Sequence, residues 1–347
     1  MNAGQKTIEW LRRDQLQVDA KWSVTRPTGF SWWAHWHAQH IDVVRDYEGP
    51  GGDKGYLVRI RTEFLRMKGP LRATGGDAEA LDVLMSTASM AGLVWDEPAG
   101  MIYLSSAARV HEGIWQWMSM LLSVAAITQI VDAHFLAAKF APILGAQEAT
   151  SGHPTSGMRQ QPDPIAMSFP SISHQHGKEE SRWSQEEFAE TLPLMQRAPA
   201  VMASGGGAGV TIEFPYGPVT SLCRIVADEP HPRLGNGLMI LQSFPVEHLG
   251  QSEAELRVRA LRENAMELGE DAKGYGFGSY CYRDGCLHWS GFLPNLIHRR
   301  GLLPNLFFAC ASRAAYAASA FGPAGAPIQR PPPSAMERLF RFFGGSS

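Results

Sequence analysis

The chain has 347 residues, of which 44% are hydrophobic and 19% are charged, and its formal net charge is −3. This length favours two folded domains, and the balanced charge argues against nucleic acid as a partner, because nothing draws the chain toward phosphate. Four cysteines are too few for a disulfide framework, so we expect reduced thiols.

The N-terminal residues lack the charged start, apolar stretch and cleavage site of a secretory signal, so we expect a cytoplasmic protein. The most apolar run, residues 118–131, is shorter than a membrane span and is followed by Asp132. The sequence therefore predicts no membrane-spanning segment.

The first half reads as helix, three strands, helix, two strands and helix. In chain order we expect a helix capped by Thr7, strands near 22–26, 30–44 and 55–67, a helix from Asp77, strands near 93–95 and 101–104, and a long helix to about Leu144. The middle strand of the first three, FSWWAHWHAQHIDVV, is unusually aromatic. A breaker-rich loop at 48–55 precedes its returning neighbour.

The second half repeats this plan after a segment, 145–177, that is rich in Ser, Pro, Gly and His and predicts a linker. Capping boxes at Ser184 and Ser252 predict two helix starts. Strands are expected at 209–214, 219–227 and 238–244. The turn Pro215-Tyr216-Gly217 lies 188 residues after Pro27-Thr28-Gly29, which we interpret as the same turn in two copies.

Asp284-Gly285 predicts the tight turn of a β-hairpin, because this dipeptide favours the primed turn types. The register should place Tyr280 opposite Trp289 and Cys281 opposite His288. The apolar side chains Tyr280, Tyr282, Leu287 and Trp289 should then share one buried face.

These elements predict an α+β protein with two tandem α-β-β-β-α-β-β-α domains, each an antiparallel sheet packed with helices. The expected boundaries are 1–144 for the first domain, 145–177 for the linker, 178–322 for the second domain and 323–347 for the tail. The tail is a proline-rich spacer followed by an amphipathic segment with Met336, Leu339, Phe340 and Phe343 at helical spacing. This short helix could dock in a partner's groove or pack on its own domain.

The strand LMILQSF at Leu238, the helix from Ser252 and the segment GSYCYRDGCLHWSGFLP resemble the type III secretion chaperone-like superfamily, which includes YbjN-like bacterial proteins. The resemblance lies in element order. It implies two copies fused in one chain, a non-enzymatic role, and a protein partner or secreted client, with a possible homodimer or a larger complex. It implies no cofactor.

The aromatic strand holds the most metal-like cluster, His35, His37 and His40, because alternate residues share one face of a strand. A polar outer sheet face is the simpler explanation of these histidines, and metal binding is the alternative. Trp33 and Trp36 beside them are either buried or exposed for partner binding.

Other possible sites have weaker signals. Cys281, Cys286, His288 and His298 could be imagined around zinc, but the spacing spans a tight turn. The glycine run 204–209 precedes a strand, unlike a phosphate-binding loop. Asp132 and Glu263 have no spacing that pairs them as acid and base.

The leading hypothesis is a chaperone-like protein that holds a partner through its sheet and helix surfaces, Trp33, Trp36 and the C-terminal helix. The alternatives are a metal-dependent enzyme that uses the three histidines in a cleft between the domains, and a structural subunit of a larger assembly.

Overall fold

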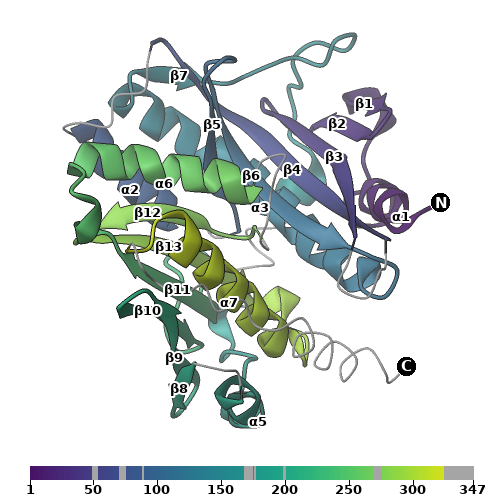
Figure 1. Ribbon diagram of the computed structural model, residues 1–347. Coiled ribbons are helices and arrows are strands. Elements are labelled where there is room, and N and C mark those ends of the chain that lie inside the picture. The colour runs from purple at the N-terminus through teal and green to yellow at the C-terminus, as the bar shows by residue number, and fades with distance from the viewer. Residues whose placement is uncertain are drawn as a thin grey trace.

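The computed structural model describes residues 1–48, 54–69, 76–87, 90–167, 175, 177–197, 201–268 and 276–323. It has an α+β fold with two antiparallel sheets, one formed by each half of the chain (Figure 1). The predicted fold class is therefore confirmed.

The first half forms a sheet covered by one long helix. Its elements are α1 (Ala3–Trp10), a π turn (Leu11–Gln15), a 3-10 turn (Ala20–Trp22), β1 (Ser23–Arg26), β2 (Gly29–Trp33), β3 (Ala38–Glu48), β4 (Lys54–Met67), α2 (Gly76–Thr87), β5 (Gly92–Asp96), β6 (Met101–Val110), α3 (Trp115–Ile143) and β7 (Ala146–Glu148). The strand order is β1-β2-β3-β4-β6-β5, and β7 pairs with the end of β4. α3 is apolar on nearly all sides, which suits a helix buried against a sheet.

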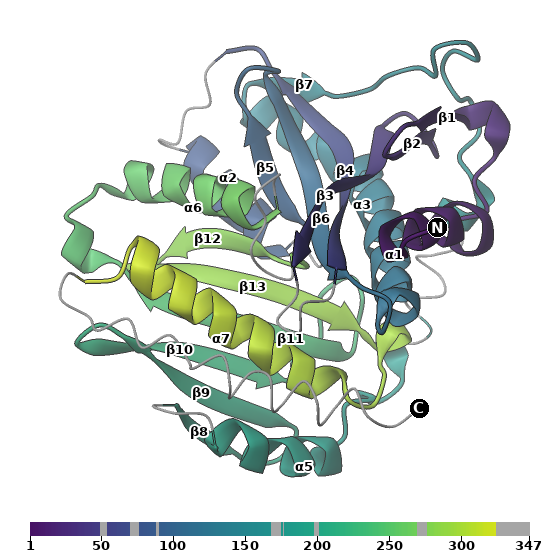
Figure 2. The ribbon, with the colours of Figure 1, turned by 45° about the vertical axis from the view of Figure 1, so that its right-hand side comes forward.

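The second half forms a six-stranded sheet within the described residues. Its elements are α5 (Gln185–Gln196), β8 (Met202–Gly205), β9 (Gly209–Tyr216), β10 (Val219–Val226), β11 (Gly237–Pro245), a 3-10 turn (Glu247–Leu249), α6 (Glu253–Leu268), β12 (Ser279–Arg283), β13 (Cys286–Pro294), a 3-10 turn (Asn295–Ile297) and α7 (Leu302–Ala320). The strand order is β12-β13-β11-β10-β9-β8. α7 lies across one face of this sheet (Figure 2).

The two sheets have the same strand order, β1-β2-β3-β4-β6-β5 and β8-β9-β10-β11-β13-β12. Their registers also correspond. Thr62 of β4 lies opposite Leu104, the fourth residue of β6, and Gln242 of β11 lies opposite Trp289, the fourth residue of β13. Over the residues that the structure describes, each half has four strands before its middle helix, where three were predicted, because the aromatic run is two strands and β8 was missed.

The two halves exchange contacts through their middle helices. α6 of the second half packs on β5 of the first, and α2 of the first half packs on β12 of the second. Figure 2 shows both helices where these edge strands approach each other. Arg257 Nε donates to Asp82 Oδ2 at 2.7 Å, and the backbones of Ala107 and Gly276 pair across the same boundary. The halves therefore meet through a reciprocal interface, as two subunits of a dimer do.

The hairpin at Asp284-Gly285 has the predicted register, with Tyr280 opposite Trp289 and Cys281 opposite His288. Both turn residues have positive φ, 49° for Asp284 and 76° for Gly285, as a type I′ turn requires. The predicted apolar face is buried, which places the hairpin in the core of the second half.

The first helix starts earlier than predicted. α1 begins at Ala3, and the Asn2 side chain accepts from the Gln5 amide at 2.9 Å while Gln5 Oε1 accepts from the Asn2 amide at 3.2 Å. Thr7 lies inside the helix, and its hydroxyl donates to the Ala3 carbonyl. The predicted Thr7 cap was wrong because this earlier capping box satisfies the helix end.

The aromatic run is a hairpin rather than one strand. Residues 34–37 form a bend between β2 and β3, and Trp33 lies opposite Ala38. As a result, the turn after Pro27 joins β1 to β2, whereas the turn at Gly217 joins β9 to β10, the counterparts of β2 and β3. The interpretation of these two turns as equivalent was wrong.

Most of the described part of the predicted linker, residues 145–167, is packed on the first half, whereas Gly177 at its end accepts from the Asn236 amide of the second half. After β7, the Ala149 amide donates to the Phe64 carbonyl, and the Ser151 amide donates to the Trp36 carbonyl at 2.8 Å. Asp163 N donates to the carbonyl of Ala34. Residues 145–167 therefore hold the β2–β3 bend in place.

One described helix, α3, is long and apolar enough to cross a membrane by length and composition, but 72% of its most apolar window is buried inside the fold. The predicted C-terminal helix with Met336, Leu339, Phe340 and Phe343 lies outside the described residues.

Candidate functional site

The structure does not bring the three candidate metal ligands together. His35 and His37 lie in the bend 34–37, where side chains no longer alternate as on a strand. His40 lies on β3, where its Nδ1 is 3.0 Å from the Ser31 hydroxyl and its Nε2 is 3.4 Å from Glu63 Oε1. Among the described residues no group of three His, Cys, Asp or Glu side chains is arranged to hold a metal ion.

Burial changes the protonation of the two bend histidines. Burial lowers the pKa of His37 to about 4, and burial is also the main cause that lowers the pKa of His35, with a smaller contribution from the nearby His134 and Arg159. Burial disfavours the charged imidazole, so His37 is neutral at pH 7. Its ring packs within the fold instead of acting as a free base.

The bend and α3 together form an exposed aromatic surface. The His35 ring stacks on Trp36 with centroids 4.2 Å apart, and His134 makes edge contacts with His35 at 5.0 Å and with Phe135 at 4.8 Å. Trp36 is 38% exposed and Phe135 is 48% exposed. We call Trp36, His134 and Phe135 the Trp36 surface; His35 is only 7% exposed and stacks on Trp36 from inside the fold.

The backbone beneath the Trp36 surface is held by the segment that follows β7. Arg159 Nη1 donates to the Trp33 carbonyl at 2.9 Å, and its Nη2 lies 3.1 Å from Asp163 Oδ2. Both side chains of this ion pair are buried. The charge-assisted bond to Trp33 at the start of the bend and the Ser151 amide bond to the Trp36 carbonyl together hold the bend backbone in place before any partner arrives.

Trp33, the second tryptophan proposed for partner binding, is only 7% exposed. Its indole Nε1 donates to the Ser151 hydroxyl at 3.2 Å, and its ring contacts the edge of His153 at 5.1 Å. This packing places Trp33 among the internal supports of the Trp36 surface. His153 itself accepts the amides of Thr155 and Ser156 in a turn closed by Gly157.

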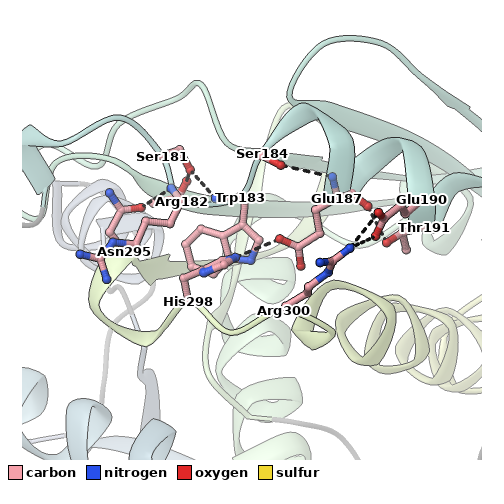
Figure 3. Close-up of polar contacts among 11 residues, drawn as sticks. Ser181, Arg182, Trp183, Ser184, Glu187, Glu190, Thr191, Asn295, His298 and Arg300 are labelled. Atoms are coloured by element: carbon pink, nitrogen blue, oxygen red, sulfur yellow. Dashed lines mark hydrogen bonds and ion pairs between the residues drawn. The ribbon is translucent and has the colours of Figure 1, made fainter.

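A second polar cluster joins α5 to the segment before α7 (Figure 3). His298 Nε2 lies 2.9 Å from Glu187 Oε2, and the Trp183 ring stands edge-on to His298 at 5.0 Å. A carboxylate and an imidazole in contact are parts of many catalytic sites. Here the neighbouring hydroxyls of Ser184 and Thr191 bond to the backbone at Glu187, so neither is placed as a nucleophile.

Figure 3 also shows Arg300 donating to both oxygens of Glu190, at 2.9 and 3.0 Å. Asn295 Oδ1 accepts from the Arg182 amide at 3.0 Å. These contacts tie the start of α5 to the chain entering α7. We therefore interpret this cluster as structural.

The two candidate carboxylates are in separate environments. Asp132 on α3 pairs with Arg233 across the boundary between the halves, and burial raises the pKa of Asp132. Glu263 on α6 accepts from the Tyr316 hydroxyl at 2.9 Å, and burial raises its pKa as well. The structure does not pair them with each other.

The imagined zinc set is also dispersed. His298 is occupied by Glu187, and His288 Nδ1 is 2.8 Å from the Ser243 hydroxyl. Cys281 is buried, and burial raises its pKa to about 12, which disfavours the thiolate that zinc requires. All four cysteines are free thiols.

Sequence reasoning missed His134 and Phe135, which lie in the most apolar helix of the chain. The available signal was weak: two aromatic rings follow Asp132 at the point where the unbroken apolar run ends. Comparison with protein-family models, with curated proteins and with solved structures finds no match for this chain.

Proposed function

We propose that this chain is a non-catalytic, chaperone-like protein that binds another protein, and that its first half contacts this partner through the Trp36 surface. The observation that carries the proposal is the pair of exposed rings, Trp36 and Phe135, held on a rigid base. Exposed tryptophan in a fixed rotamer is a common binding hot spot, since it offers a large contact area at little conformational cost.

The surrounding chemistry supports a protein partner more than a reaction. Four of the titratable groups singled out from the sequence, Asp132, Glu263, His40 and His298, are each paired with a side chain in the structure. The reciprocal contacts of α2 and α6 join the two halves through their inner edges. The Trp36 surface lies away from these contacts and can therefore bind a partner. A partner segment with apolar side chains and a polar rim would match the two exposed rings and the His134 imidazole of the Trp36 surface.

The C-terminal segment with Met336, Leu339, Phe340 and Phe343 remains part of this proposal as a second point of contact. An amphipathic helix on a proline-rich spacer can reach a groove at some distance from the folded body. Removing residues 323–347 should leave the fold intact and weaken partner capture. Unchanged capture by the truncated chain would exclude the tail from binding.

The test of the Trp36 surface uses the double variant Trp36→Ser/Phe135→Ser. Its matched control is Val219→Ser, because Val219 is 47% exposed and follows the turn of the second half that corresponds to the bend 34–37. We expect proteins captured from the source organism by the wild type and the control to be lost from the double variant. Equal capture by all three proteins, each with an unchanged circular dichroism spectrum, would contradict the proposal.

The metal-dependent enzyme is separated from this proposal by metal analysis of the purified protein. A stoichiometric transition metal that disappears in His37→Ala would favour the enzyme over the binding protein.

A further inference from the structure

A pocket of about 570 Å³ lies between the two halves of the chain. One wall comes from the outer face of the first sheet, with Arg61 on β4 and Tyr103 and Ser105 on β6. The opposite wall is α6 of the second half. The volume of the pocket lies within the range of binding sites for small molecules, roughly 300–1,000 Å³.

The sheet wall is positively charged and rich in donors. The Arg61 guanidinium lies 5.0 Å from the centre of the Tyr103 ring, and Arg61 Nε is buried without a hydrogen-bond partner among the described residues. Burial raises the pKa of Tyr103, so its phenol keeps its proton. Arg59, two residues before Arg61 on β4, also lines the pocket, and Arg262 of α6 adds a third positive charge from the other side. Arginine is the side chain best shaped to bind a carboxylate.

The helix wall is apolar apart from Arg262. Val258, Leu261, Ala265 and Leu268 line the pocket from successive turns of α6, at a spacing that puts them on one face of the helix. A ligand in this pocket would therefore meet the arginines of the sheet on one side and, on the other, a helix face that is apolar apart from Arg262. Asp96 and Glu97 also line it, and their carboxylates would repel a ligand with several negative charges.

The second half shows that the fold does not require this chemistry. In the matching register, Leu241 of β11 occupies the place of Arg61, and His288 of β13 occupies the place of Tyr103. Leu241 faces Ser290 just as Arg61 faces Ser105. The second half forms the same sheet with the apolar Leu241 at the position of Arg61. Sheet formation therefore does not require an arginine at this position, which favours a binding role for Arg61.

We propose that this pocket binds an amphipathic monoanion, a single carboxylate joined to an apolar body. The carboxylate lies at Arg61 and the Tyr103 hydroxyl, and the apolar body lies along α6 at Leu261 and Leu268. Since the walls belong to different halves, the bound ligand joins them and stabilises their interface.

The test is calorimetric titration of the full chain with decanoate, and with decan-1-ol as the uncharged counterpart. We expect saturable binding of one decanoate per chain and at least tenfold weaker binding of decan-1-ol. Arg61→Met should weaken decanoate binding at least tenfold. Ala265→Phe, which fills the apolar side, should remove it, whereas Met266→Phe on the exposed side of the same helix should leave it unchanged.

Saturable binding that persists at wild-type strength in both Arg61→Met and Ala265→Phe would overturn the proposal, as would the absence of decanoate binding to the wild type. If Arg61→Met does not fold, the comparison of decanoate binding by Ala265→Phe and by Met266→Phe tests the proposal: equal binding by these two variants would overturn it. Trp36→Ser should bind decanoate normally, which separates this pocket from the Trp36 surface.

Discussion

Both halves of the chain bury a polar network at the same place beneath their last helix, with different chemistry. In the first half, Thr62 donates to Gln129 Oε1 at 2.9 Å, and Gln39 donates to the backbone of α3 at Ala126. In the second half, the corresponding network places Arg313 against the Glu267 carboxylate and 3.6 Å from the centre of the Trp289 ring. One network is neutral and the other contains two buried charges.

This difference shows that the repeated topology does not depend on one set of core residues. Gln242 on β11 donates to the carbonyl of Cys310, as Gln39 on β3 does to that of Ala126. What both halves retain is a polar anchor between sheet and helix. Breaking the charged network should reduce the free energy of unfolding more than breaking the neutral one. A buried ion that loses its partner is destabilised far more than a buried amide that loses a hydrogen bond.

The largest effect should follow from breaking the charged network. Arg313→Met leaves the Glu267 carboxylate buried without its counter-ion, so we expect a loss of about 3–5 kcal/mol in the free energy of unfolding. Urea unfolding followed by tryptophan fluorescence measures it. The double variant Arg313→Met/Glu267→Leu should recover most of the loss. A loss below about 1 kcal/mol in the single variant would mean that the pair is not buried as described.

The bend of the first half should be acid-sensitive, whereas its counterpart at Gly217-Pro218 has no histidine. The folded-state pKa of His37 is about 4, below its ordinary value of 6.5. The unfolded chain therefore binds a proton first as the pH falls. Stability is fully present above pH 6.5 and declines as the pH falls toward 4, by about 2 kcal/mol between pH 7 and pH 5.

Urea unfolding of the wild type and of His37→Gln at both pH values checks this expectation. The variant should show the smaller decline between pH 7 and pH 5. Equal declines in the two proteins would show that His37 is solvated in the folded state.

The neutral network should be less sensitive than the charged one. Gln129→Leu removes the acceptor of Thr62 and the donor to Ser106, whose hydroxyl accepts from Gln129 Nε2 at 2.9 Å. Two buried hydroxyls then lose a partner, so we expect a loss of about 1–3 kcal/mol. Thermal unfolding of Gln129→Leu and of Arg313→Met shows which network contributes more to the stability of the fold. A larger loss in Gln129→Leu would reverse the comparison.

The smallest effect concerns the turns before β6 and β13, where Gly100 and Gly285 occupy matching positions. Both have positive φ, 61° and 76°, so alanine at either place should cost about 1 kcal/mol. A Cβ at Gly285 would also lie 3.0 Å from Glu247 Oε1, whereas at Gly100 the nearest atom is 3.9 Å away. Gly285→Ala should therefore be the more destabilising change in urea, and equal losses would show that Glu247 moves aside.

The parts of the fold predicted from sequence were those specified locally. The register of the Asp284-Gly285 hairpin follows from turn chemistry alone, and the capping boxes at Ser184 and Ser252 mark real helix starts. The bend 34–37 could not be predicted in this way. It has no turn residue, and the Arg159 and Asp163 contacts that hold it come from more than a hundred residues later.

The candidate sites were harder to predict than the fold. Trp36 was singled out from the sequence as an aromatic side chain in an unusual run, whereas its position beside His134 of α3 appears only in the structure. The pocket at Arg61 was not foreseen, since its second wall is α6, nearly two hundred residues away. Period and composition describe one element at a time, whereas both sites form where elements from distant parts of the chain meet.

The central claim is that the Trp36 surface of the first half, and not its counterpart in the second, contacts the partner. Photo-crosslinking measures this directly, with p-benzoylphenylalanine placed at position 36 in one protein and at position 219 in another, each expressed in the source organism. The account predicts a discrete crosslinked protein from position 36 that is absent from position 219 and is lost on Phe135→Ser. Crosslinks of equal yield from both positions, or crosslinks from position 219 alone, would contradict it.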